Sequence, residues 1–170
     1  LYVRRGVRIA PVLLGAGQER GLRPGTENVA SIVGLGAACA LAADLEEQAR
    51  RQGALRDRLQ ERLRAAIPGL RLNGHPTERL PNTLNLSFPG VRGGALLALA
   101  PEIAASTGSA CHEGAERPSA ALTAMGLDEA TALGAIRLSL GRATTAEEIE
   151  RAADALARAW REARGAAPAN

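Results

Sequence analysis

One long helical pattern in the first half of the chain limits what the chain can fold into. Leucine and isoleucine recur every four residues from position 55 to position 67, which is the spacing of one face of an α-helix. An apolar run over residues 29–45 precedes this stripe, and Pro68-Gly69 follows it. We therefore predict a bridging helix over residues 41–69 between two domains, with Gly53 as the candidate position of a kink or break.

The remainder of the chain is expected to form short strands and helices in an α/β arrangement. Residues 1–14 are apolar but interrupted by glycine and proline, which predicts short extended pieces. Residues 70–170 are typical of a small α+β domain. Its strands are expected at residues 70–72, 83–88, 103–105 and 136–140, and its helices at 94–99, from Pro118 to Met125, from Asp128 to Leu133 and after the capping box of Thr145 and Glu148.

Composition narrows the function classes. The 170 residues carry a net charge of +3, with acidic and basic residues interspersed, so no direct binding of nucleic acid is expected. No apolar run approaches the roughly 20 residues of a membrane helix, so no membrane contact is expected. Two cysteines make no disulfide framework, which favours a reducing, cytoplasmic location. The chain begins inside a strand-like run rather than at methionine, so we expect a fragment.

The first candidate for chemistry is Cys111. Its neighbours over residues 106–114 are mostly small or polar, so the segment is expected to be an exposed, mobile loop. A cysteine attacks as its thiolate, and a neighbour such as His112 favours that form. The alternative is that Cys111 packs as a small apolar residue. Cys39, in an apolar helical run, is expected to fill a core, and a metal site at Cys111 is not expected because ligand spacing is missing.

Arg137 is the second candidate. In the predicted strand, Ile136 and Leu138 face one side, and Arg137 and Ser139 face the other. The planar guanidinium of an arginine suits a carboxylate, which it binds through two hydrogen bonds. An internal salt bridge is the alternative for this side chain.

The third candidate is the loop over residues 15–25, which is rich in glycine and arginine. Thr26, Glu27 and Asn28 follow it and are expected to open a helix, with Thr26 as the cap. Glycines allow close approach to a ligand, and a helix N-terminus favours negative charge, so the loop is a candidate anion site. Such loops are common, and a helix cap alone remains the alternative for Thr26.

Four stretches together resemble the NifS/IscS-type cysteine desulfurases, and they occur in the order found in that family. They are Gly17-Gln18-Glu19-Arg20-Gly21-Leu22-Arg23-Pro24-Gly25-Thr26-Glu27-Asn28, residues 80–88, Ser109-Ala110-Cys111 with Pro118-Ser119, and Ile136-Arg137-Leu138-Ser139-Leu140-Gly141-Arg142. Each stretch is moderately specific, and the set covers nearly the whole chain.

The resemblance implies a homodimer with an α/β fold, the pyridoxal-phosphate-dependent transferase fold of type I, in the class V aminotransferase group. Residues 1–40 would be the end of the large cofactor-binding domain, residues 41–69 the bridging helix, and residues 70–170 the small α+β domain. Such an enzyme converts L-cysteine to L-alanine and passes the sulfur, as a persulfide, to sulfur-acceptor and iron–sulfur scaffold proteins, or toward thiamine and thiolated tRNA.

The resemblance also assigns roles to the three candidates. Cys111 matches the nucleophile that carries the persulfide, and Arg137 matches the arginine that holds the substrate carboxylate. Thr26 matches the threonine that reaches the pyridoxal 5'-phosphate of the neighbouring subunit. Metal ligands are not implied.

The chain departs from the family in two ways. All 21 basic residues are arginine, so the lysine that forms the Schiff base is missing, and the chain alone is expected to be inactive. His112 stands where a small polar residue is usual, and a histidine at this position is similar to the selenocysteine lyases. The spacing from Cys111 to Pro118 is instead similar to that of the long-loop desulfurases. A selenocysteine lyase fragment and a non-catalytic persulfide carrier or assembly domain are the alternatives.

Overall fold

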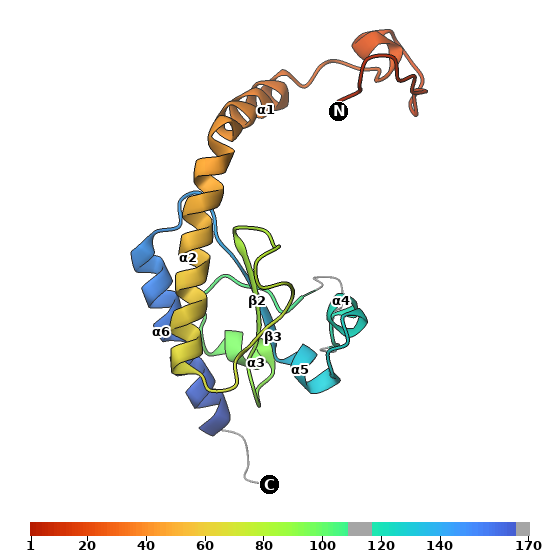
Figure 1. The fold of residues 1–170 in the computed structure, drawn as a ribbon. Helices are drawn as coiled ribbons and strands as arrows, with labels where there is room; N and C mark the ends of the chain where they lie inside the picture. Colours follow the sequence, from red (N-terminus) through yellow and green to blue (C-terminus); the bar gives the residue numbers. More distant parts are fainter. Residues whose placement is uncertain (109–116, 166–170) are drawn as a thin grey trace. The chain divides into compact units, whose positions relative to one another are not determined.

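The chain forms two compact units in the computed structural model, which describes residues 1–108 and 117–165 (Figure 1). The first unit is Leu1–Asp44 and the second is Leu45–Asn170. The change of unit after Asp44 falls within the predicted bridging segment. The predicted domain boundaries at residues 40 and 69 remain a prediction. The two compact units are defined by the contacts within each of them, and these contacts do not identify the domains of the family.

The first unit is built around one apolar helix. It contains a 3-10 turn, η1 (Gln18–Gly21), the helix α1 (Val29–Leu41) and a second 3-10 turn, η2 (Ala42–Asp44). No residue of α1 is buried, and the helix carries no charged side chain. In the described part of residues 1–14 no strand forms, because no neighbouring strand is present there to pair with them.

Asn28, not Thr26, caps helix α1. The Asn28 side chain accepts a hydrogen bond from the backbone N–H of Ser31 at 3.1 Å, and α1 begins at Val29. The expectation that Thr26 caps the helix is therefore wrong. Thr26 lies too early, and its own carbonyl instead accepts a hydrogen bond of 2.9 Å from the Arg23 guanidinium.

The second unit contains an antiparallel sheet of three strands in the order β1-β2-β3, which are β1 (Arg71–Leu72), β2 (Thr83–Ser87) and β3 (Ala135–Ser139). In the register of β2 and β3, Leu84 pairs with Leu138 and Leu86 pairs with Ile136. All four of these residues are buried, as the alternation of the sequence predicts. The strand expected at residues 103–105 does not form, since that segment meets β3 only through a single bridge at Ser106.

Helices cover the apolar face of this sheet. They are α2 (Leu45–Ala66), α3 (Gly93–Ala98) and α6 (Ala146–Gly165). The four-residue stripe predicted from the sequence supplies Leu59, Leu63 and Ile67, each at most 2% exposed. Leu156 of α6 is fully buried beside them in the same core. Gly53 neither kinks nor splits α2, which runs unbroken through it.

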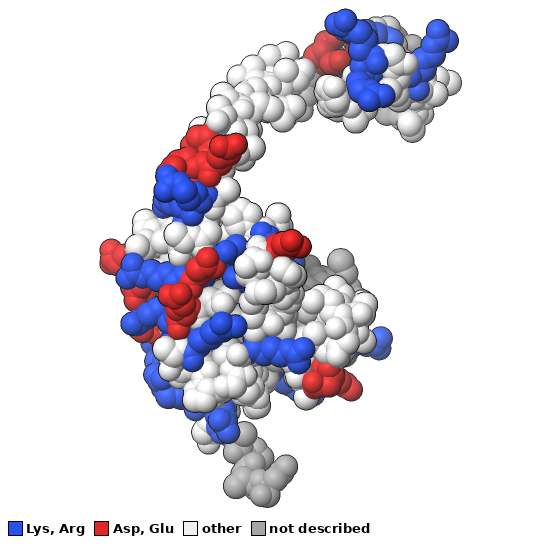
Figure 2. All heavy atoms as spheres, viewed as in Figure 1, with Lys and Arg blue, Asp and Glu red and all other residues white. Residues whose placement is uncertain are grey.

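The two long helices of this unit, α2 and α6, lie side by side (Figure 1). Ion pairs join their exposed edges: Arg58 contacts Glu150 at 2.5 Å, and Arg62 contacts Glu150 at 3.1 Å and Asp154 at 3.0 Å. Figure 2 shows the resulting mixture of acidic and basic atoms over these helices. Because such exposed pairs are each worth only about 0–1 kcal/mol, the apolar contacts beneath them determine the packing.

Two short helices, α4 (Ala120–Ala124) and α5 (Glu129–Leu133), lead into β3. Asp128 caps α5 by accepting a hydrogen bond of 2.9 Å from the Thr131 N–H, as predicted. The predicted capping box before α6 is also present, because the N–H of Thr145 donates to Glu148 and the N–H of Glu148 donates to the Thr145 hydroxyl.

Two arginines connect the segment between β1 and β2 to helix α2. Arg56 is 8% exposed and donates to the Leu80 carbonyl at 3.0 Å. Arg79 donates to Gln60 at 2.9 Å and to Asp57 at 3.2 Å. Burial is the main cause that lowers the pKa of Arg79, and the nearby Arg56 charge lowers it further. These contacts give the connecting segment a structural attachment to the core helix.

One helical stretch of the described residues, Val29–Ala66, contains a window long and apolar enough to cross a membrane by length and composition alone. None of that window is buried. Core helices of soluble proteins satisfy the same test, so the absence of membrane contact stays a prediction.

Candidate functional site

Arg137 lies exposed in the middle of strand β3. Its neighbours Ile136 and Leu138 are 0% and 5% exposed and enter the core, so alternation directs Arg137 to the opposite face of the sheet, as predicted. Among the described residues its guanidinium forms no ion pair, so the internal salt bridge considered as an alternative is not found there. An exposed guanidinium on a rigid strand is suited to binding an anion.

The chain that leads toward Cys111 is anchored directly beside Arg137. The N–H of Arg137 donates to the Ser106 carbonyl at 2.7 Å, and the N–H of Ser106 donates to the Arg137 carbonyl at 3.2 Å. The Ser106 hydroxyl and the N–H of Gly108 then form a tight local turn. This turn bends the chain directly after the bridge between Ser106 and Arg137. The segment therefore does not continue along β3 as a strand.

A close helix contact supports the same region. A Cβ atom placed on Gly93, at the start of α3, would lie 2.7 Å from the Ala135 carbonyl and 3.0 Å from the Thr107 side chain. Only a glycine allows the helix to approach β3 and residue 107 so closely. Helix α3 therefore holds the beginning of β3 and the segment after Ser106 in a fixed relation.

Cys111 and His112 lie outside the described residues, so the predicted exposed loop remains a prediction. Among the described residues no group of three or more histidine, cysteine, aspartate or glutamate side chains could hold a metal ion. His75 takes part in a local turn, in which its Nδ1 accepts a hydrogen bond of 2.8 Å from the N–H of Glu78.

A hydrogen-bonded network on the polar face of the sheet was not predicted. Asn73 is 8% exposed, and its Nδ2 donates to Asn85 Oδ1 at 2.8 Å and to Ser87 Oγ at 2.7 Å. Asn85 is the direct partner of Arg137 in the register of β2 and β3. The alternation of polar residues at 83, 85 and 87 was the available signal that these side chains share one face.

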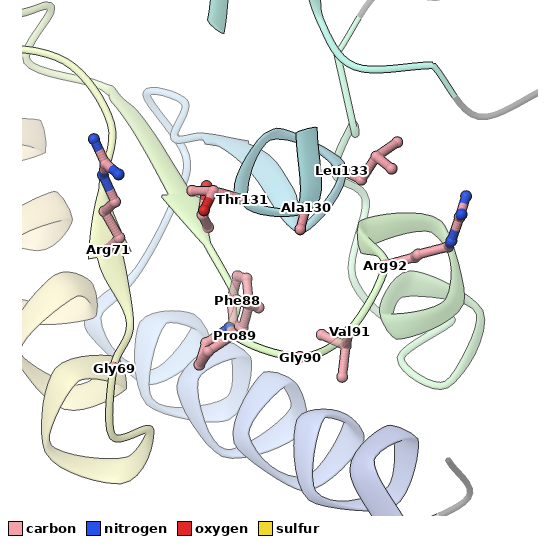
Figure 3. Close-up of a pocket in the computed structure, with 11 residues that line it drawn as sticks. Gly69, Arg71, Phe88, Pro89, Gly90, Val91, Arg92, Ala130, Thr131 and Leu133 are labelled. Atoms are coloured by element: carbon pink, nitrogen blue, oxygen red, sulfur yellow. The ribbon is translucent and has the colours of Figure 1, made fainter. Parts of the chain in front are cut away.

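A cavity of about 470 Å³ borders this network (Figure 3). Figure 3 shows Arg71 and Arg92 at opposite ends of the cavity, with Phe88 and Pro89 between them. Of the residues that the structure describes, no acidic side chain lines it, and neither Arg137 nor Thr26 does. Ser87 both lines the cavity and accepts the hydrogen bond from Asn73, so the network reaches the edge of the cavity.

Thr26 lies in the other compact unit and is exposed. Its hydroxyl has no hydrogen-bond partner among the described residues, whereas its carbonyl is held by Arg23. Gly25, with φ of +96°, donates its N–H to Gln18 Oε1 at 3.2 Å, which closes the loop before it. The exposed Thr26 hydroxyl is available to an anion, and the anion site at this loop stays a prediction.

Cys39 is exposed on helix α1, so the prediction that it fills a core is wrong for the described chain. A helix that is apolar on every side needs neighbours on every side. The described part of the first unit has no other long helix and no strand to provide them. The apolar surroundings of Cys39 were identified correctly, but their burial requires residues beyond this unit.

Comparison with known proteins connects these separate features. The family model described as "Aminotransferase class-V" matches residues 7–152. Over 154 residues the chain is 51% identical to the cysteine desulfurase IscS of Methanosarcina thermophila, and it is 47% identical to the cysteine desulfurase NifS of Azotobacter vinelandii. Each comparison covers 89% of this chain but only 38% of the relative, so the chain spans little more than a third of the length of these relatives.

Solved structures agree in fold. A structure described as a NifS-like protein superposes on the chain with a TM-score of 0.78 at 38% identity, covering 92% of this chain and 40% of that one. The NifS-like protein from Rickettsia africae gives a TM-score of 0.76 at 30% identity, covering 91% of this chain and 41% of that one. The predicted fold class, the type I fold of pyridoxal-phosphate-dependent enzymes, is thereby confirmed.

Proposed function

Because this chain belongs to the class-V aminotransferase family, we propose that the protein containing it is a cysteine desulfurase. The activity is the conversion of L-cysteine to L-alanine, with the sulfur transferred to Cys111 as a persulfide. Sulfur-acceptor and iron–sulfur scaffold proteins are the proposed recipients. The relatives described above are themselves named cysteine desulfurases, which favours this activity over a selenocysteine lyase or a carrier.

The observation that carries the proposal is the pairing of Arg137 with Ser106. It places an exposed guanidinium beside the start of the segment that contains Cys111. Cys111 is five positions after Ser106, and a fully extended chain of that length spans at most roughly 18 Å. A substrate whose carboxylate is bound by Arg137 is therefore within the covalent reach of a thiol on this segment.

The residues of this chain have three roles in the proposed reaction. Arg137 binds the substrate carboxylate and orients the amino acid on the polar face of the sheet. Cys111, as its thiolate, forms an S–S bond with the substrate sulfur while the carbon–sulfur bond breaks; the electron pair of that bond stays with the carbon, which takes up a proton to give alanine. The thiolate of an acceptor protein then attacks the outer sulfur of the persulfide, and the Cys111 thiolate leaves.

Pyridoxal 5'-phosphate, the cofactor of this family, supplies an electron sink for breaking the carbon–sulfur bond when it is bound. The residues of this chain can hold the phosphate of the cofactor but not its aldehyde. Thr26 offers an exposed hydroxyl and lies three residues before helix α1, which suits a phosphate. No lysine is present to bind the aldehyde, so that group must come from a part of the enzyme outside these 170 residues.

The test uses the full-length protein that carries this chain. We expect it to release alanine from L-cysteine, and we expect Cys111→Ser to abolish persulfide formation while substrate binding persists. Arg137→Lys keeps the charge but loses the planar fork, so it should raise the KM for cysteine about tenfold or more. Arg71→Lys, on strand β1 of the same sheet, is the matched control and should leave KM unchanged.

Two results would count against this function. No alanine formed by the wild-type protein with its cofactor would reject the desulfurase activity. An unchanged KM in Arg137→Lys, together with a lowered melting temperature, would show that Arg137 serves the fold instead.

We further propose that Thr26 acts across the interface of a homodimer, as the family resemblance implies. Subunits with Thr26→Ala and subunits lacking the Schiff-base lysine should each be impaired alone. In mixed dimers both lesions would fall on one site and leave the other intact, so activity should return on mixing. If subunit exchange is verified and activity does not return, Thr26 serves its own subunit.

A further inference from the structure

Asn85 and Arg137 form a direct pair on the polar face of the sheet. Their Cα atoms are partners in the register of β2 and β3, and directly paired side chains have Cβ atoms about 4.5–5.5 Å apart. Thr83 and Ser139 form the next pair along the same face. Neither strand contains an acidic residue, so β2 and β3 place no negative charge on this face that would repel an anion.

The orientation of the Asn85 amide is set by Asn73. The backbone N–H of Asn73 donates to the Asn85 carbonyl at 2.9 Å, and Asn73 Nδ2 donates to Asn85 Oδ1 at 2.8 Å. With its Oδ1 bound on the side of β1, Asn85 has its Nδ2 protons on the opposite side of the amide. Among the described residues Asn85 Nδ2 has no acceptor.

The network of Asn73, Asn85 and Ser87 leaves one buried polar atom without a hydrogen bond. Both hydrogen bonds of Asn73 Nδ2 are made within the sheet, but Asn73 Oδ1 is buried without a partner among the described residues. A buried acceptor without a partner costs free energy. An apolar residue would fill this position without that cost, so the network is better explained by positioning Asn85 than by packing.

We propose that Asn85 is a second binding group for the substrate carboxylate, acting beside Arg137, and that Asn73 is the residue that positions it. A carboxylate offers about four acceptor positions, of which a guanidinium fork uses two. The Nδ2 of Asn85 donates to a remaining position from the neighbouring strand. Strand β2 thereby contributes to substrate recognition as well as β3, and this role rests on the proposed function of the whole protein.

The experiment compares two ligands that differ only in the carboxylate. L-alanine and L-alaninamide are titrated by calorimetry into the full-length protein with its cofactor, so no sulfur chemistry is required. The wild-type protein should prefer alanine. Asn85→Ala should weaken alanine binding about 10- to 100-fold, the effect of one hydrogen bond to a charged group, and leave alaninamide binding unchanged.

Two further variants separate positioning from folding. Asn73→Asp replaces the donor with an acceptor, so it should reduce the preference for alanine in the same way as Asn85→Ala. Thr83→Ala, one pair away on the same face, is the matched control and should keep the wild-type preference. If Asn85→Ala does not fold, Asn85→Asp keeps the shape and the acceptor for Asn73, and its added negative charge should abolish the preference.

The outcomes are distinct from those that test the proposed function. An equal loss of affinity for both ligands, or an unchanged preference in a folded Asn85 variant, would overturn the role of Asn85. A wild-type protein with no preference for the carboxylate would overturn it as well. Failure to form alanine from cysteine, with the ligand preference intact, would instead reject the desulfurase activity and leave the carboxylate site standing.

Discussion

Gly134 and Gly53 should respond in opposite directions to the same substitution, alanine. Gly134, just before β3, has an ordinary φ of −79°, so its backbone accepts any residue. A Cβ atom there would lie 2.6 Å from the Phe88 carbonyl oxygen and 3.0 Å from the Val91 carbonyl oxygen. Gly53, inside helix α2, has no atom within 4 Å of the same position.

The magnitudes decide the sign at each site. Alanine in an open helix interior is favoured over glycine by about 0.5–1 kcal/mol, so Gly53→Ala should stabilise the second unit by that amount. At Gly134 the backbone oxygens must move, and the Gly134 carbonyl also accepts a hydrogen bond of 2.9 Å from the N–H of Phe88. Overpacking of this kind costs about 1–3 kcal/mol, which exceeds any gain from reduced chain entropy.

Urea unfolding of the chain measures both effects through Trp160. It is the only tryptophan, it is 6% exposed, and its Nε1 donates to the Pro89 carbonyl at 3.0 Å, next to the perturbed segment. With a denaturant slope of about 1.5 kcal/mol per molar urea, Gly134→Ala should lower the midpoint by roughly 0.7–2 M and Gly53→Ala should raise it by roughly 0.3–0.7 M. A midpoint for Gly134→Ala equal to or above that of the wild type would refute the close approach.

Three further predictions concern titration and reactivity. The hydrogen bond from the Thr145 N–H holds the pKa of Glu148 below its usual value of 4.5. Because the pKa is lower in the folded state, this hydrogen bond stabilises the fold above pH 4.5, and the stabilisation is lost as the pH falls through the folded pKa. Glu148→Gln should therefore show a smaller fall in melting temperature on acidification than the wild type, and an identical fall would contradict the assignment. Exposed Cys39 should react with a thiol reagent in the native chain as fast as in urea, and strong protection would mean that α1 is covered. Borohydride reduction of the chain with pyridoxal phosphate should add mass only at the N-terminal amine, since an adduct elsewhere would require another reactive amine.

The sequence predicted most elements of the second unit, because they have strong local signals, but not the failure of residues 103–105 to form a strand. The stripe containing Leu59 and Leu63 gave the core face of α2, and the capping residues Asp128 and Thr145 located the starts of α5 and α6. The predictions failed where the outcome depends on neighbours. Cys39 lies in an apolar helix, but its burial depends on packing partners that no local pattern reveals.

The candidate site shows the same division. Alternation in the strand placed Arg137 on the polar face correctly, because period-two patterning is a local property. The pairing of Arg137 with Asn85 depends on strand register, and the link from Asn85 to Asn73 depends on a third strand. Neither follows from the spacing of residues along the chain, so this network could only be found in three dimensions.

Two of the ion pairs between α2 and α6, Arg58–Glu150 and Arg62–Asp154, join residues 92 positions apart, and this separation has a consequence for protein synthesis. At about 5–20 residues per second, roughly 5–18 s pass between translation of the two partners. During that interval the leucine face of α2 and the apolar face of the sheet lack the covering that α6 provides. A premature stop before residue 146 would make this exposure permanent, so the loss of α6 should turn the chain into a chaperone client or an aggregate.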